Sequence, residues 1–201
     1  MRPTYEQLRA LRQRLSLPWF TDPWDLNLVI LRSDEVGRWD DLLCLAYVDG
    51  DGREHVEVIP CTSDAWVGEW TAPTHPDGCL YILDQHVPGG YGPGLHKGRP
   101  ALRQREPFRY VRWPRRDRIP TVDELEALAA SASFTGIRGT HVHNRVSDRV
   151  PERPARDDSE GCVVVMRAGD IHVVMRLVEL QRRHVGTDTV SPTFARLRDL
   201  R

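Results

Sequence analysis

Cysteine is scarce in this sequence, with four among 201 residues. Cys44, Cys61, Cys79 and Cys162 form no CxxC pair, which excludes the common zinc-knuckle and thioredoxin motifs. The polar N-terminal stretch MRPTYEQLRALRQRL has no apolar segment of the kind found in signal peptides. The expectation is therefore a cytoplasmic protein whose thiols are reduced.

Long hydrophobic runs and an excess of charge are also missing. No stretch approaches the roughly 20 apolar residues of a membrane span, so no membrane partner is expected. The net charge is −1, which gives no electrostatic basis for binding nucleic acid. With 40% hydrophobic and 28% charged residues, the composition is that of an ordinary globular domain. We expect no cofactor, and the oligomeric state stays open.

Short apolar or alternating runs predict a mainly β (α+β) protein with helices towards both ends. Strands are expected at 26–31, 42–48, 55–59, 79–83, 108–113 and 163–166, with a hairpin turn at 49–52. Helices are expected at 5–15, 121–132 and 170–184. The stretch 88–94, PGGYGPG, is expected to be a loop. We expect a helical extension at 1–20, a catalytic domain at 21–185 and a tail at 186–201.

One cysteine stands in a context that suggests chemistry. Cys162 follows Gly161 at the head of an apolar run, where a tight turn lets a substrate approach closely. The N–H groups of these two residues could face a developing oxyanion. His143 ends an alternating run over 137–143, and an imidazole beside the thiol could accept its proton. A lone cysteine is more often a small packing residue, and this is the interpretation of the other three.

A metal site is the alternative use of the histidines. His141 and His143 are two residues apart and so share one side of a strand. Together with Cys162 and a third histidine, His96 or His172, they would offer the ligand types that zinc prefers. We favour the thiol because an HxH pair alone is a weak signal, so no metal is expected.

Further side chains are candidates for contacting a substrate. Tyr91, His96 and Lys97 lie in or just after the glycine-rich stretch, a position suited to the rim of a site. Arg145 could bind a substrate carboxylate through two hydrogen bonds. The segment 144–158 is expected to arch over or beside the site, with a solvated surface loop as the alternative.

The order of these residues resembles a known signature. His143-Asn144, the fourteen residues 145–158 and then Ser159-Glu160-Gly161-Cys162 resemble the active-site motif of L,D-transpeptidase catalytic domains. That motif reads His-Gly, a similar gap, and Ser/Thr-His-Gly-Cys. A longer set of segments resembles uncharacterised phage and bacterial proteins related to that fold, and it includes 25–29, 39–42, 88–91, 94–98 and 136–144.

The resemblance implies an L,D-transpeptidase-like β-sandwich that acts on peptidoglycan stem peptides. It implies that Cys162 is the acyl-accepting nucleophile and that His143 is its base. It also makes Ser159 the serine of the motif and Gly161 the glycine of the oxyanion turn.

The sequence departs from the family motif at several positions. Asn144 replaces a glycine, Glu160 replaces a histidine, and valines follow the cysteine where the family usually has arginine or asparagine. Glu160 could orient His143 and favour its imidazolium form. It could equally raise the thiol pKa by repulsion. Asn144, Glu160 and His141 are further candidates for substrate contact.

Three functions follow from these patterns. The favoured one is an enzyme of cysteine-dependent acyl transfer on stem peptides, as a transpeptidase, carboxypeptidase or endopeptidase, in a phage or prophage setting. Reaching the wall would need lysis, a phage particle or a non-classical export route. The alternatives are a non-catalytic wall-binding or phage structural module of the same fold, and a zinc-dependent hydrolase that uses His141 and His143.

Overall fold

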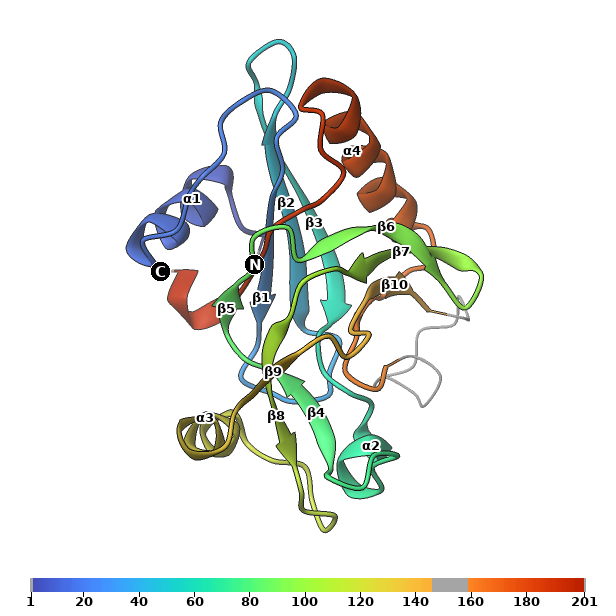
Figure 1. Ribbon diagram of the computed structural model, residues 1–201. Helices are drawn as coiled ribbons and strands as arrows, with labels where there is room; N and C mark the ends of the chain where they lie inside the picture. Colours follow the sequence, from blue (N-terminus) through green and yellow to red (C-terminus); the bar gives the residue numbers. More distant parts are fainter. Residues whose placement is uncertain (1, 146–158, 201) are drawn as a thin grey trace.

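The computed structural model describes residues 2–145 and 159–200, and its largest feature is a nine-stranded sheet (Figure 1). The order across this sheet is β5 (Gln85–His86), β12 (Pro192–Arg196), β1 (Asn27–Arg32), β2 (Asp41–Val48), β3 (Glu54–Thr62), β11 (Val163–Val165), β10 (Val142–Asn144), β7 (Arg99–Gln104) and β6 (Tyr91–His96). The pairs β1–β12 and β10–β11 are parallel, and the other neighbours are antiparallel.

Helices cover both faces of the long central strands. Helix α4 (Asp170–His184) packs Ile171, Val174 and Val178 into the main core on one face, together with Leu28 and Ile30 of β1. Helix α1 (Tyr5–Arg14) lies on the opposite face, where it contacts the 3₁₀ helix η1 (Leu197–Leu200) (Figure 1). Because β1 is buried on both faces, its central residues 28–31 form a continuous apolar run without alternation.

A second, three-stranded sheet lies below the long strands in Figure 1. It consists of β4 (Cys79–Ile82), β8 (Phe108–Trp113) and β9 (Phe134–Gly136). One face of this sheet joins the main core, and the other packs against α3 (Val122–Ser131). The short helix α2 (Val67–Thr71) lies beside β4. The junction of the two sheets frames the site described below.

The structure confirms the mainly β class and the predicted helices. Helix α3 begins after Thr121, whose side chain and that of Glu124 form the predicted capping box. Within residues 2–145 and 159–200, no helix combines the length and apolar composition that a membrane crossing requires.

The prediction of a loop at 88–94 is confirmed for 88–90 and wrong for 91–94, because Tyr91 to Gly94 begin the edge strand β6. Pro93 is tolerated there because an edge strand has one side without ladder hydrogen bonds. A Cβ atom on Gly92 or Gly94 would lie within 3 Å of the side chains of Arg105 and Arg103, so these glycines make room for arginines.

The last residues form more than a tail. Strand β12 inserts between β5 and β1 and pairs with β1 in parallel, so 192–196 belong to the main sheet. Of the alternating run 137–143, only the end forms a strand, β10. The predicted arch over 144–158 lies outside the described residues from 146 onward.

Candidate active site

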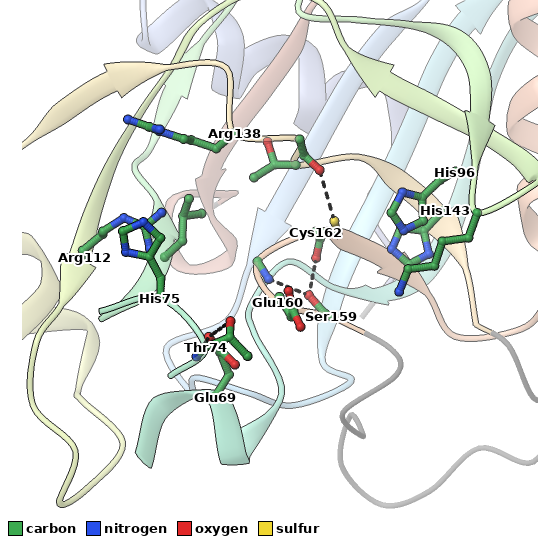
Figure 2. Close-up of a pocket in the computed structure, with 15 residues that line it drawn as sticks. Glu69, Thr74, His75, His96, Arg112, Arg138, His143, Ser159, Glu160 and Cys162 are labelled. Carbon is green, nitrogen blue, oxygen red and sulfur yellow. Dashed lines mark hydrogen bonds between the residues drawn. The ribbon is translucent and has the colours of Figure 1, made fainter. Parts of the chain in front are cut away.

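A cavity of about 250 Å³ opens where β10 and β11 meet the small sheet. Figure 2 shows Cys162 between two groups of side chains, with His96 and His143 on one side and His75, Arg112 and Arg138 on the other. The lining consists of Glu69, Thr74, His75, Leu80, His96, Lys97, Arg112, Arg138, Gly139, Thr140, His143, Ser159, Glu160, Gly161 and Cys162.

A tight turn presents Cys162 to this cavity. The Ser159 hydroxyl donates to the carbonyl oxygen of Cys162 at 2.9 Å and accepts from the Gly161 N–H at 3.0 Å (Figure 2). Gly161 has φ +120°, and a Cβ there would lie 3.0 Å from a methyl of Leu80. The carbonyl of Ser159 accepts from the N–H of Trp66, which fixes the turn to the start of α2.

The structure leaves only one of the two N–H groups expected to bind an oxyanion, those of Gly161 and Cys162. The Gly161 N–H is already bonded to the Ser159 hydroxyl, so it is not available to a substrate. The N–H of Cys162 makes no hydrogen bond to any described residue. Of the two main-chain donors expected from the sequence, the N–H of the cysteine itself is therefore the one that remains for an oxyanion.

The sulfur of Cys162 is held by main-chain groups of the segment before β10. The His141 N–H donates to Sγ at 3.4 Å, and the thiol lies 3.6 Å from the carbonyl oxygen of Gly139. Although part of the residue is exposed, burial of the thiol raises its pKa to about 11. The His141 N–H and Lys97 oppose this rise, whereas Glu160 adds to it. This contribution agrees with the repulsive role considered for Glu160.

His143 lies on β10, beside β11, and is oriented by its own strand. Its Nδ1–H donates to the carbonyl oxygen of Asn144 at 2.8 Å, which leaves Nε2 as the basic nitrogen. The ring stacks on that of His96, with centroids 4.5 Å apart and planes 25° apart. Burial lowers the pKa of His96, and Lys97 and Arg103 lower it further.

His141 lies behind the cavity rather than in its wall. Its side chain is buried, and Nδ1 accepts from the Gln104 N–H at 3.2 Å. Burial, followed by the neighbouring His96, lowers its pKa to about 4, so the ring is neutral near pH 7. The expected substrate contact is therefore not supported, and His141 acts on the sulfur through its main chain.

The zinc alternative gains no support from the ligand geometry. Within the described ranges, no group of three or more histidine, cysteine, aspartate or glutamate side chains is placed to hold a metal ion. His96 and His143 meet face to face instead of aiming nitrogens at one point. His172 lies on the exposed side of α4.

Three other expected contacts differ from the structure. Tyr91 is fully buried and packs edge-on against Phe108, because β6 turns its ring into the main core. Arg145 is also buried, with its guanidinium over the ring of Trp39, and it does not line the cavity. Asn144 contributes its carbonyl oxygen to His143 and likewise does not line the cavity.

Sequence reasoning did not identify the two arginines of the cavity wall, Arg112 and Arg138. It also did not identify Gln104, which holds the segment that carries Arg138 and Thr140. Gln104 Oε1 accepts from the N–H groups of Arg138 and Thr140 and from the Thr140 hydroxyl. The position of Arg138 and Thr140, just before His141, was a usable signal. No local sequence pattern pointed to Arg112 or Gln104, because pairing between strands that are distant in the sequence brings them to the cavity.

The comparisons with known proteins add no family to this picture. No family model, curated protein or solved structure matched the chain. The resemblance to L,D-transpeptidases stays a prediction from motif order, and the function is argued from the geometry of the cavity.

Proposed function

We propose that this protein performs cysteine-dependent acyl transfer on peptides, with peptidoglycan stem peptides as the substrate class. The observation that carries the proposal is the shared cavity of Cys162 and His143, residues that lie nineteen positions apart in the sequence. A glycine turn presents the thiol, and a fixed imidazole lines the same space (Figure 2). These are the parts that nucleophilic catalysis by a thiol requires.

In the proposed reaction, the Cys162 sulfur attacks the carbonyl carbon of an amide while its proton moves to Nε2 of His143. The new carbon–sulfur bond creates an oxyanion that accepts from the Cys162 N–H. Collapse breaks the carbon–nitrogen bond, and the imidazolium returns the proton to the leaving amine. Water or an amine then attacks the thioester, loses a proton through His143, and releases the free thiol.

The thiol pKa decides between two forms of this mechanism. Because burial raises it to about 11, the unliganded site holds a neutral thiol near pH 7. A neutral imidazole matches that state, since it accepts the proton as the sulfur attacks. A preformed thiolate–imidazolium pair is therefore not the resting form that we propose.

Digestion of purified muropeptides tests the proposal. We expect cleavage or cross-linking by the wild-type protein, none by Cys162→Ala, and a loss of about 10²–10⁴-fold in His143→Gln. His172→Gln is the matched control, because His172 is exposed on α4. Equal digestion by the wild type and Cys162→Ala, or none by either, contradicts the proposal.

The same thiol pKa favours a second candidate, a non-catalytic module that binds wall peptides. A neutral, partly buried thiol is a poor nucleophile unless a base removes its proton. Sedimentation with insoluble peptidoglycan separates the two candidates. Binding that survives Cys162→Ala, without any release of muropeptides by the wild type, supports the module and rejects the enzyme.

The proposed setting is a cytoplasmic protein that meets the wall after lysis, in a phage particle or by a non-classical route. The proposal needs no cofactor or metal, since the thiol, the imidazole and a main-chain N–H supply its groups.

A further inference from the structure

The wall of the cavity opposite His96 and His143 carries two guanidinium groups that have no acidic partner among the described residues (Figure 2). Arg112 and Arg138 both line the cavity, and neither forms an ion pair with a carboxylate in the described part of the chain. Elsewhere in the protein, arginines such as Arg32 and Arg196 do pair with carboxylates. Two cations that line the cavity of a candidate nucleophile, and that no described carboxylate neutralises, suggest that the ligand carries a negative charge.

Neutral acceptors and one aromatic ring fix these arginines in place. Arg138 Nε donates to the Tyr110 hydroxyl at 2.6 Å, and Arg112 Nη1 donates to the carbonyl oxygen of Gly78 at 2.8 Å. Both guanidiniums lie over the Tyr110 ring, at 5.2 and 5.8 Å from its centroid. Each contact uses one of five N–H donors, so most donors of each group remain for an anion.

Both arginines are open to a ligand. Arg138 is exposed and Arg112 is half-buried, and together with His75 they also line an adjoining hollow of about 160 Å³. Glu69 and Glu160 line the main cavity and Asp77 lines the adjoining hollow, but none of these carboxylates forms an ion pair with either arginine in the described part of the chain. Glu69 accepts from the N–H and hydroxyl of Thr74, and Glu160 is exposed beside the cysteine turn (Figure 2).

We infer that Arg112 and Arg138 form a carboxylate subsite that recognises a free carboxylate close to the scissile amide of the substrate. Guanidinium groups match carboxylates in geometry and bind them through paired, charge-assisted hydrogen bonds. The cavity of about 250 Å³ is smaller than the ~300–1,000 Å³ of most ligand pockets, which suits the end of a peptide. This role was expected of Arg145, which is buried against Trp39 instead.

The inference rests on the proposed function, and it restricts the peptide substrates to those with a free carboxylate near the scissile amide. The carboxylate has two chemical sources: the α-carboxylate of the residue that leaves, or a side-chain carboxylate of the residue that is acylated. The first source is the substrate of a carboxypeptidase, and the second is a diamino-dicarboxylic residue at the acyl position.

Titration calorimetry on the Cys162→Ala protein tests the subsite without turnover. The probes are a stem tetrapeptide ending in D-alanine, its C-terminal amide, and an amidated version with diaminopimelic acid at the acyl position. We expect the free acid to bind at least about tenfold more tightly than the plain amide, since charged hydrogen bonds are lost with the carboxylate. If the diaminopimelic amide binds as tightly as the free acid, the subsite accepts the side-chain source.

Variants of the arginines complete the test. In the Cys162→Ala protein, a second substitution, Arg112→Gln or Arg138→Gln, is expected to abolish the preference for a carboxylate. The binding of the plain amide is expected to stay unchanged. Arg109→Gln is the matched control, because Arg109 lies on the same strand, is exposed and does not line the cavity. Circular dichroism melts establish that each variant is folded.

The outcomes separate the subsite from the chemistry. Equal binding of the free acid, the plain amide and the diaminopimelic amide overturns the subsite, as does no binding of any probe or an equal loss in Arg109→Gln. A carboxylate preference that depends on both arginines upholds it, even if the wild-type protein never forms an acyl-enzyme, in which case the proposed enzymatic function fails alone.

Discussion

At the scale of single residues, the four cysteines are distinguished by position and not by acidity. Cys44, Cys61 and Cys79 are free and buried, each in a different hydrophobic cluster, as expected of packing residues. Burial raises the pKa of Cys44 to about 12 and that of Cys162 to about 11. Cys162 differs because it borders a cavity shared with an imidazole and with charged groups of both signs.

The titration of Cys162 follows first from its burial and then from those charges. Alkylation by iodoacetamide, read at Cys162 by peptide mass spectrometry, is expected to accelerate with rising pH beyond pH 9, because the thiolate forms near pH 11. Removing the negative charge in Glu160→Gln lowers the thiol pKa and speeds alkylation at pH 9 by roughly two- to fivefold. Lys97→Gln removes a positive charge, raises the pKa and slows it by a similar factor.

The control for this titration is Glu54→Gln, a charge change at an exposed position of β3 that does not line the cavity. A rate that reaches its plateau by pH 7 contradicts the neutral-thiol account, because it reports a thiolate already paired with an imidazolium.

At the scale of elements, the site depends on one glutamine that fastens the segment before β10. Gln104, at the end of β7, accepts three hydrogen bonds from Arg138 and Thr140 and donates to the carbonyl oxygens of Glu106 and Gly136. This segment continues into His141, whose N–H contacts the sulfur of Cys162. The Gln104 side chain therefore links β7 to the segment whose main chain contacts the sulfur of Cys162.

Gln104→Leu is expected to lower the free energy of unfolding by about 2–4 kcal/mol, because it leaves several buried polar groups unpaired. It also misplaces the segment 138–141, so the proposed peptide reaction slows. Gln85→Leu is the matched control, since Gln85 bonds Arg109 and Leu83 in a similar way but does not line the cavity. Denaturant unfolding and muropeptide digestion measure the two effects, and equal activity losses in both variants contradict the role.

The elements that the sequence predicted are those specified locally. The capping box at Thr121, the hairpin turn at 49–52 and the 3.6-residue period of α4 each lie within a few neighbouring residues. Strand β6 was missed because its glycines are typical of a turn, whereas in the structure the side chains of Arg103 and Arg105 fill the space beside them. The carboxylate subsite was missed because Arg112 and Arg138 converge only when the small sheet forms.

At the scale of the whole molecule, a buried charged network joins the two sheets that frame the cavity. Arg32 of β1 pairs with Asp64 at 2.9 Å and donates to the Ser63 hydroxyl, and its guanidinium lies 3.9 Å from the ring centroid of Tyr81 in β4. Arg196 of β12 donates to the Tyr81 hydroxyl at 2.7 Å. The relative position of the sheets, and so the shape of the cavity, depends on these contacts.

Arg32→Met removes one partner of this network and leaves the buried Asp64 carboxylate without its cation. The expected cost is about 3–5 kcal/mol in the free energy of unfolding, measured by urea denaturation. Arg38→Met is the control, because Arg38 pairs with Glu35 on the surface, and its loss costs at most about 1 kcal/mol. Equal, small effects in both variants contradict the view that the network holds the sheets together.

The most direct test of the account is intact-protein mass spectrometry after incubation with a stem tetrapeptide or with a carbapenem, whose strained amide can acylate a nucleophilic thiol. The account predicts one added acyl group, located at Cys162 by peptide mapping, and no addition in Cys162→Ala. A wild-type protein that stays unmodified under both conditions, or that is acylated equally after Cys162→Ala, contradicts the claim that this thiol is a nucleophile.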